Sequence, residues 1–96
     1  MSIDKTELRI VRIAKALSDR TRVRILQEIA KRGKISCGDA VKLAGLSQPT
    51  VSHHLKILID AGLVTPVKHG RHVTMSVSKN AIESFAALLP VRDRAR

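Results

Sequence analysis

A mainly helical domain with a β-hairpin near its C-terminal end is the fold class that this sequence predicts. The prediction rests on two changes of period. Up to about residue 61, apolar residues recur at the three- and four-residue spacing of amphipathic helices, interrupted by short turn sequences. Residues 72–77 instead alternate between apolar and polar, as in a half-buried strand, and helical spacing then returns. The expected order within a single domain, residues 1–96, is α-α-α-α-β-β-α.

The first two helices are predicted from their apolar stripes and from the residues at their ends. The first should cover roughly residues 4–17, with an apolar stripe formed by Ile10, Ile13, Ala14 and Leu17 and widened by Leu8 and Val11. Ser18 or Asp19 then caps a second helix that Gly33 ends, and its inward residues should be Val23, Leu26, Ile29 and Ala30. The broad stripe of the first helix suits either a partner subunit or its own domain.

Two further helices joined by a tight turn are predicted between residues 36 and 63. Ser36-x-x-Asp39 resembles a capping box that opens a short third helix, with Ala40, Leu43 and Ala44 as its buried side. Gly45-Leu46-Ser47 then leads into a fourth helix, for which Ser47 is a good N-cap and Pro49 falls in the first turn. Two helices joined by a three-residue turn containing Gly form the helix-turn-helix pattern.

The fourth helix has one apolar face and one polar face. Its apolar stripe consists of Val51, Leu55, Leu58 and Ile59, and Gly62 with Leu63 predicts a Schellman ending in which Leu63 packs on Leu58. The opposite face carries hydrogen-bonding side chains and one cation, with no acid before Asp60; these residues are Gln48, Thr50, Ser52, His53 and Lys56. Such a face suits a DNA major groove, although an ordinary surface helix would have a similar pattern.

A β-hairpin and a last helix complete the predicted domain. Residues 64–77 read as the hairpin, with Pro66 confining its strand to an edge and with Val73, Met75 and Val77 facing inward. A turn glycine lies at the tip among the basic residues Lys68, His69, Arg71 and His72. A basic hairpin after a recognition helix is a wing. Ser78 or Asn80 should start the last helix, with Ile82, Phe85, Ala86 and Leu89 inside, and residues 90–96 form a basic tail.

Composition narrows the class of partner. Lys and Arg number 18 against 8 acids, and the formal net charge of +10 suits nucleic acid. Without Trp or Tyr the chain has no aromatic platform for single-stranded bases, so duplex DNA is favoured. No apolar run approaches the length of a membrane span, and the single cysteine fits the reducing cytoplasm. No nucleophile–base pair, phosphate loop or cofactor motif indicates an enzyme.

The order of elements and several motifs together resemble the ArsR/SmtB family of winged helix-turn-helix repressors. The motifs are ALSDRTRVRIL, LSQPTVSHHLKIL, DAGLV and HGRHV, and the resemblance covers roughly residues 8–89. It implies a homodimer paired through the first and last helices, with each fourth helix in a major groove of an inverted-repeat operator. It also implies base contacts from Gln48, Ser52 and His53, phosphate contacts from Thr50 and Lys56, and a wing contact from Arg71. His54 flanks the apolar stripe and is expected to be structural.

The chain departs from this family at the positions of its metal sites. Metal sensors of the family carry Cys-x-Cys-Asp in the third helix, whereas the matching stretch here is Ser36-Cys37-Gly38-Asp39. The metal motif of the last helix is absent as well, so we expect no metal among the ligands of this chain. A weakly bound ion at His69-x-x-His72 of the hairpin is the alternative.

Cys37 and the outer surface leave two functional alternatives open. Cys37 is expected to be a small, semi-buried helix residue, or else a redox-sensitive thiol, because the start of a helix stabilises a thiolate. The chain would then be a redox-responsive repressor. The other alternative is a winged helix whose grooves bind a protein, although the polar outer face of the fourth helix offers few apolar anchors for that role.

Overall fold

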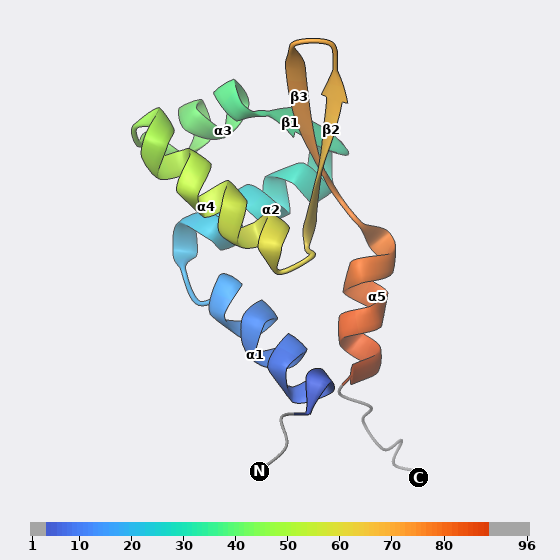
Figure 1. Ribbon diagram of the computed structural model, residues 1–96. Coiled ribbons are helices and arrows are strands. Elements are labelled where there is room, and N and C mark those ends of the chain that lie inside the picture. Colours follow the sequence, from blue (N-terminus) through green and yellow to red (C-terminus); the bar gives the residue numbers. More distant parts are fainter. Residues whose placement is uncertain (1–3, 89–96) are drawn as a thin grey trace, which may run out of the picture.

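The computed structural model describes residues 4–88 and contains five helices and a three-stranded antiparallel sheet (Figure 1). In chain order the elements are α1 (Lys5–Ala16), α2 (Arg20–Arg32), β1 (Lys34–Ser36), α3 (Cys37–Ala44), α4 (Gln48–Asp60), β2 (Val64–His69), β3 (His72–Val77) and α5 (Lys79–Leu88). The mainly helical fold class with a β-hairpin wing is confirmed. Leu89 and the predicted tail at residues 90–96 lie outside the described residues.

The ends of the helices are fixed by the capping residues that the sequence indicates. Asp19, not Ser18, is the N-cap of α2, and its side chain accepts from the backbone N–H of Arg22. Ser36 and Asp39 form the predicted capping box of α3. The Schellman ending of α4 is also present: the N–H of Leu63 donates to the carbonyl of Leu58 and that of Gly62 to Ile59, with Gly62 at φ 79°. The chain therefore leaves α4 at a defined angle into β2.

The wing is part of a sheet that also contains a strand the sequence analysis missed. The strand order is β1-β3-β2, so β3 lies in the centre, and β1 pairs with it through Lys34 opposite Ser76 and Ile35 opposite Met75. Pro66 lies in β2 at the sheet edge, as predicted, where its missing N–H leaves no gap in the central ladder. β1, the strand that the sequence analysis missed, therefore joins the C-terminal end of α2 to the wing.

The core lies between α2, α3, α4 and the inner face of the sheet, and Ile13 and Ala16 of α1 extend it. Its largest fully buried side chains are Ile13, Ile25, Ile29, Ile35, Val51, Leu58 and Leu63. Several inward positions were predicted wrongly: Ala14, Ala30, Ala86 and Ile82 are exposed, while Ala16 and Ile25 are buried. In α1 and α2 the buried side is displaced to one flank of the predicted stripe, because the fold buries the flank on which the neighbouring elements lie.

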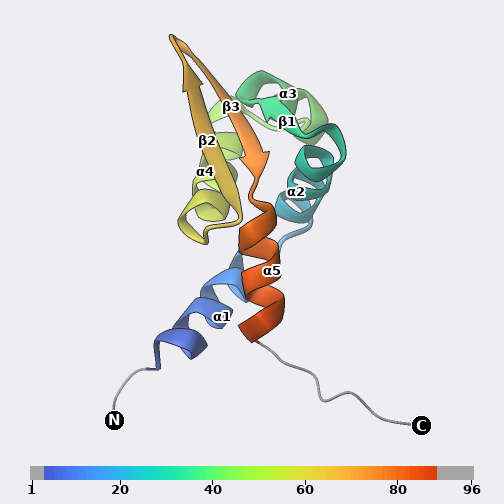
Figure 2. The ribbon, with the colours of Figure 1, turned by 90° about the vertical axis from the view of Figure 1, so that its right-hand side faces the viewer.

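The two terminal helices extend away from this body. α1 and α5 lie next to each other at the end of the molecule opposite the wing tip, and Figure 2 shows them diverging from the sheet. Leu8 and Val11 of α1 and Ile82 of α5 remain exposed, with exposed fractions of 40%, 58% and 41%. Phe85 is half-buried against the core of its own domain. Among the described residues, no helix is long and apolar enough to cross a membrane.

Candidate nucleic-acid interface

α3 and α4 form a helix-turn-helix whose turn is set by its backbone. Gly45 ends α3 in the left-handed conformation at φ 66°, which an L side chain rarely adopts. Two residues later the Ser47 side chain accepts from the Thr50 N–H and so caps α4, and its Oγ lies 2.9 Å from the Thr50 Oγ1. This turn determines which face of α4 points outward.

The buried stripe of α4 leaves the predicted reading face exposed. Val51, Leu55 and Leu58 are buried, so the helix cannot rotate without exposing its stripe to water. The five α4 residues predicted to contact DNA are all exposed: Gln48, Thr50, Ser52, His53 and Lys56. These residues form one outward polar surface, the α4 reading face.

The tip of the wing carries a second group of exposed basic residues. Lys68 and His69 end β2, Arg71 follows the turn glycine, and His72 begins β3 opposite His69; all four are exposed. The hairpin rises as a separate projection beside the α3–α4 unit (Figures 1 and 2). Reading face and wing tip thus offer two distinct sites of contact with an extended partner.

Arg22 connects α1 to α4, and the sequence analysis did not identify it. Its Nε donates to the Ala16 carbonyl at 2.7 Å and its Nη2 to the Lys15 carbonyl at 3.2 Å, at the C-terminal end of α1. Its Nη1 lies 3.1 Å from the His54 Nδ1 on α4. One guanidinium therefore bonds the last turn of α1 and a residue adjacent to the reading face. The only signal in the sequence was an arginine three residues after the helix cap Asp19.

His54 and Asp19 complete this connection. His54 is mostly buried, and its Nδ1 also lies 3.9 Å from the Asp19 Oδ2. His54 therefore contacts two residues at the start of α2, the N-cap Asp19 and Arg22. The backbone N–H of Arg22, which donates to the Asp19 carboxylate, and the positive charge of the Arg22 guanidinium hold the pKa of Asp19 below its ordinary value. These contacts agree with the structural role expected of His54.

Comparison with known proteins places this architecture. Residues 17–67, which include the helix-turn-helix, match the family of helix-turn-helix domains. The probable mercury resistance operon repressor of Streptomyces lividans is 38% identical over 77 residues, which are 80% of this chain and 61% of that protein. An ArsR-like transcriptional regulator from Rhodococcus sp. RHA1 superimposes with a TM-score of 0.78 at 28% identity, over 88% of this chain and 78% of that one. The chain belongs to the ArsR/SmtB family.

One solved structure concerns assembly, and the Streptomyces relative concerns length. The homodimeric winged helix-turn-helix DNA-binding domain Mb0332 from Mycobacterium bovis, a possible ArsR-family regulator, superimposes with a TM-score of 0.74 at 25% identity, over 92% of this chain and 83% of that domain. The present chain spans only 61% of the length of the Streptomyces relative.

Within this ArsR/SmtB fold, Cys37 lies at the interface of the two helix-turn-helix helices. It is the first residue of α3 and is half-buried, and its Sγ lies 4.0 Å from the Oγ of Ser52 on the reading face. Residues 4–88 contain no group of three or more His, Cys, Asp or Glu side chains that could hold a metal ion. His69 and His72 face each other across the hairpin without such a third residue.

Proposed function

We propose that this chain is a dimeric repressor that binds duplex DNA sequence-specifically by inserting α4 into the major groove. The observation that supports it best is the α4 reading face. This face is polar, carries no acid before Asp60, and is directed outward by the buried residues Val51, Leu55 and Leu58. Membership of a family of transcriptional regulators supports the same function.

The proposed mechanism divides the work between charge and hydrogen bonding. Lysines and arginines, including Lys56 and the wing residues Lys68 and Arg71, neutralise phosphates and supply most of the affinity. Gln48, Ser52 and His53 contact base edges and supply discrimination. A dimer then reads an inverted repeat, and its occupancy of a promoter in the cytoplasm prevents transcription from starting.

Selection of bound sequences from random duplexes tests this function directly. We expect enrichment of an inverted repeat whose half-sites lie about one helical turn, or a small multiple of it, apart. A Gln48→Ala, Ser52→Ala, His53→Ala triple variant is the matched control, because all three side chains are exposed and their loss should leave the fold intact. Failure of the wild-type chain to enrich any duplex would contradict the proposal and favour a protein-interaction module.

We also propose that transition metals are not the signal that releases this repressor. Zinc prefers four N, S or O ligands, and the third-helix motif retains only Cys37, at the position between the two cysteines of the family's metal sensors. Operator affinity should therefore be the same with or without zinc, cadmium or arsenite at about 10 µM, a concentration that would saturate a site of micromolar affinity. Release of DNA by stoichiometric metal would overturn this proposal.

Redox control through Cys37 is a second candidate function, and one distance favours it. Oxidation of the thiolate by hydrogen peroxide forms a sulfenic acid and releases hydroxide, which adds an oxygen to a sulfur only 4.0 Å from the Ser52 Oγ. The added atom would displace a side chain of the reading face. Peroxide should then release operator DNA from the wild-type protein but not from Cys37→Ser, while equal release from both proteins would exclude Cys37.

A further inference from the structure

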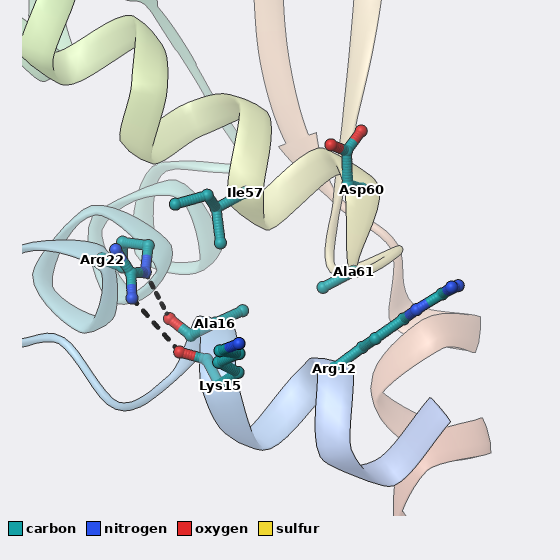
Figure 3. A pocket seen from close by; sticks show the side chains of 7 residues that line it. All are labelled: Arg12, Lys15, Ala16, Arg22, Ile57, Asp60 and Ala61. Atoms are coloured by element: carbon teal, nitrogen blue, oxygen red, sulfur yellow. Dashed lines mark hydrogen bonds between the residues drawn. The ribbon is translucent and has the colours of Figure 1, made fainter. Parts of the chain in front are cut away.

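α1 and α4 enclose a hollow that the proposed DNA contacts do not use. Its volume is about 730 Å³, within the usual range for small-molecule sites. Figure 3 shows it between the two helices, with Ile57 and Ala61 on the α4 side and Ala16 on the α1 side. We call this hollow the α1–α4 cleft. The remaining lining residues are Arg12, Lys15, Arg22 and Asp60.

The charges around the cleft are strongly unequal. Three cations, Arg12, Lys15 and Arg22, line it against the single carboxylate of Asp60. An adjoining hollow that shares Arg12 and Asp60 adds Lys5 and Arg9 to the rim. In the described part of the chain, neither Arg12 nor Lys15 takes part in an ion pair. Positive charges clustered beside apolar walls raise the local concentration of anions.

DNA does not account for these cations. The reading face extends from Gln48 to Lys56 of α4, whereas the cleft is lined by Ile57, Asp60 and Ala61 at the C-terminal end of this helix. The cleft also borders α1, and α1 lies at the end of the molecule opposite the wing tip (Figure 1). A duplex that contacts both the reading face and the wing would therefore not neutralise Arg12 and Lys15.

We propose that the α1–α4 cleft binds a small organic carboxylate with an apolar body and a hydrogen-bond donor at its far end. The carboxylate pairs with Arg12 and Lys15, and the apolar body lies against Ala16, Ile57 and Ala61. The Asp60 carboxylate accepts from the donor, which gives its charge a partner and selects against a plain hydrocarbon acid.

Binding in this cleft would influence DNA recognition through Arg22, a step that rests on the proposed function. The guanidinium has five N–H donors, and its three contacts with the Lys15 and Ala16 carbonyls and with His54 leave two of them for a ligand. A carboxylate in the cleft attracts the Arg22 guanidinium and so draws it away from its contact with His54 on α4. It also adds negative charge to the DNA-binding unit, so ligand and operator should oppose each other.

Titration of the full dimeric chain with 6-hydroxy-2-naphthoate tests the site, with backbone amide NMR as the readout. We expect saturable shifts at Ala16, Ile57 and Ala61, and the neutral 6-hydroxy-2-naphthamide should bind at least about tenfold more weakly, since it lacks the charge. The double variant Arg12→Gln, Lys15→Gln should bind the carboxylate more weakly by a similar factor. Arg24→Gln with Lys31→Gln is the control, because both residues are exposed on α2 outside the cleft and the net charge falls equally.

The outcomes separate the cleft from the proposed function. Absence of shifts at the cleft up to about 10 mM, beyond which binding is too weak to matter, would overturn the site. Shifts confined to the reading face and wing would do the same, because they would show an anion on the DNA surface. Operator affinity that falls less than about fivefold at saturating carboxylate would overturn the coupling through Arg22. Carboxylate binding by a chain that enriches no duplex would preserve the site and remove the repressor function.

Discussion

Ser52 lies between two roles: its hydroxyl is on the reading face of α4, yet it is also within 4.0 Å of the Cys37 sulfur. Gln48 and His53 have no such neighbour among the side-chain hydrogen bonds of the described residues. Of the three predicted base readers, only Ser52 therefore also contacts α3. This difference should appear when the three are replaced one at a time.

Replacing Gln48, Ser52 or His53 with Ala should weaken the preferred site selectively. Each lost base contact should cost about 1–3 kcal/mol on the selected operator, while affinity for random duplex changes little. Competition binding at fixed salt measures both quantities. Thr50→Ala is the comparison, because its hydroxyl lies next to Ser47 and should affect all sequences alike. Equal losses on every duplex from all four variants would refute the assignment of base readers.

A second residue-scale prediction concerns the capping box of α3 and the response to acid. The N–H and hydroxyl of Ser36 and the charges of Arg32 and Lys42 hold the pKa of Asp39 below its usual value. A carboxyl whose pKa is lower when folded stabilises the fold above its unfolded pKa of about 3.9 and loses that contribution as the pH falls through the folded value. Asp39→Asn should therefore lower the melting temperature at neutral pH, and the gap from wild type should close in strong acid. A gap that stays constant across the pH range would contradict this assignment.

At the scale of elements, local signals specified more of this fold than contacts between distant residues did. The caps at Asp19 and Ser36 and the Schellman ending at Gly62 depend on neighbours within a few residues, so the sequence reveals them. β1 is three residues long and exists because Ile35 pairs with Met75, forty positions later, which no local pattern shows. The bond between Arg22 and His54 likewise spans 32 positions.

Because Arg22 connects α1 to α4, we expect it to affect operator affinity as well as stability. Arg22→Ala removes charge-assisted bonds to two carbonyls and to His54, and each such bond contributes about 1.5–3 kcal/mol. We expect the variant to have a lower free energy of unfolding. We also expect its folded molecules to bind the operator more weakly than the wild type does. A double-mutant cycle with His54→Ala, read as operator affinity, should give a coupling of about 0.5–3 kcal/mol. Additive effects on affinity would limit Arg22 to holding α1 in place.

The wing predicts a change in salt dependence. If Arg71 neutralises one phosphate, Arg71→Ala should reduce the slope of log affinity against log salt by about 0.9 per protomer and affect all duplexes similarly. Arg24→Ala on the exposed face of α2 removes the same charge far from the wing tip and should leave the slope unchanged. An unchanged slope for Arg71→Ala would remove the wing from the DNA interface.

At the scale of the whole molecule, we expect a second copy to pack on the exposed apolar residues of the two terminal helices. Leu8 and Val11 of α1 are 40% and 58% exposed, and Ile82 on the adjacent α5 is 41% exposed. Phe85 of α5 is half-buried in its own core, so α1 contributes more of the exposed apolar surface than α5 does. Apolar residues gathered on two neighbouring terminal helices indicate a protein–protein contact. A two-fold dimer would cover them on both protomers at once.

Val11→Glu should therefore convert the protein to a monomer at micromolar concentration, because it would place a carboxylate in an apolar interface. The control is Val67→Glu, since Val67 is a valine of the wing that is 38% exposed and lies far from α1. Sedimentation should show a dimer for the wild type and for Val67→Glu. A dimer binds an inverted repeat more tightly because its two reading helices contact both half-sites at once. Monomeric Val11→Glu should therefore bind a full operator with little more affinity than it has for a single half-site. A wild-type chain that sediments as a monomer, both free and on DNA, would refute the two-fold assembly.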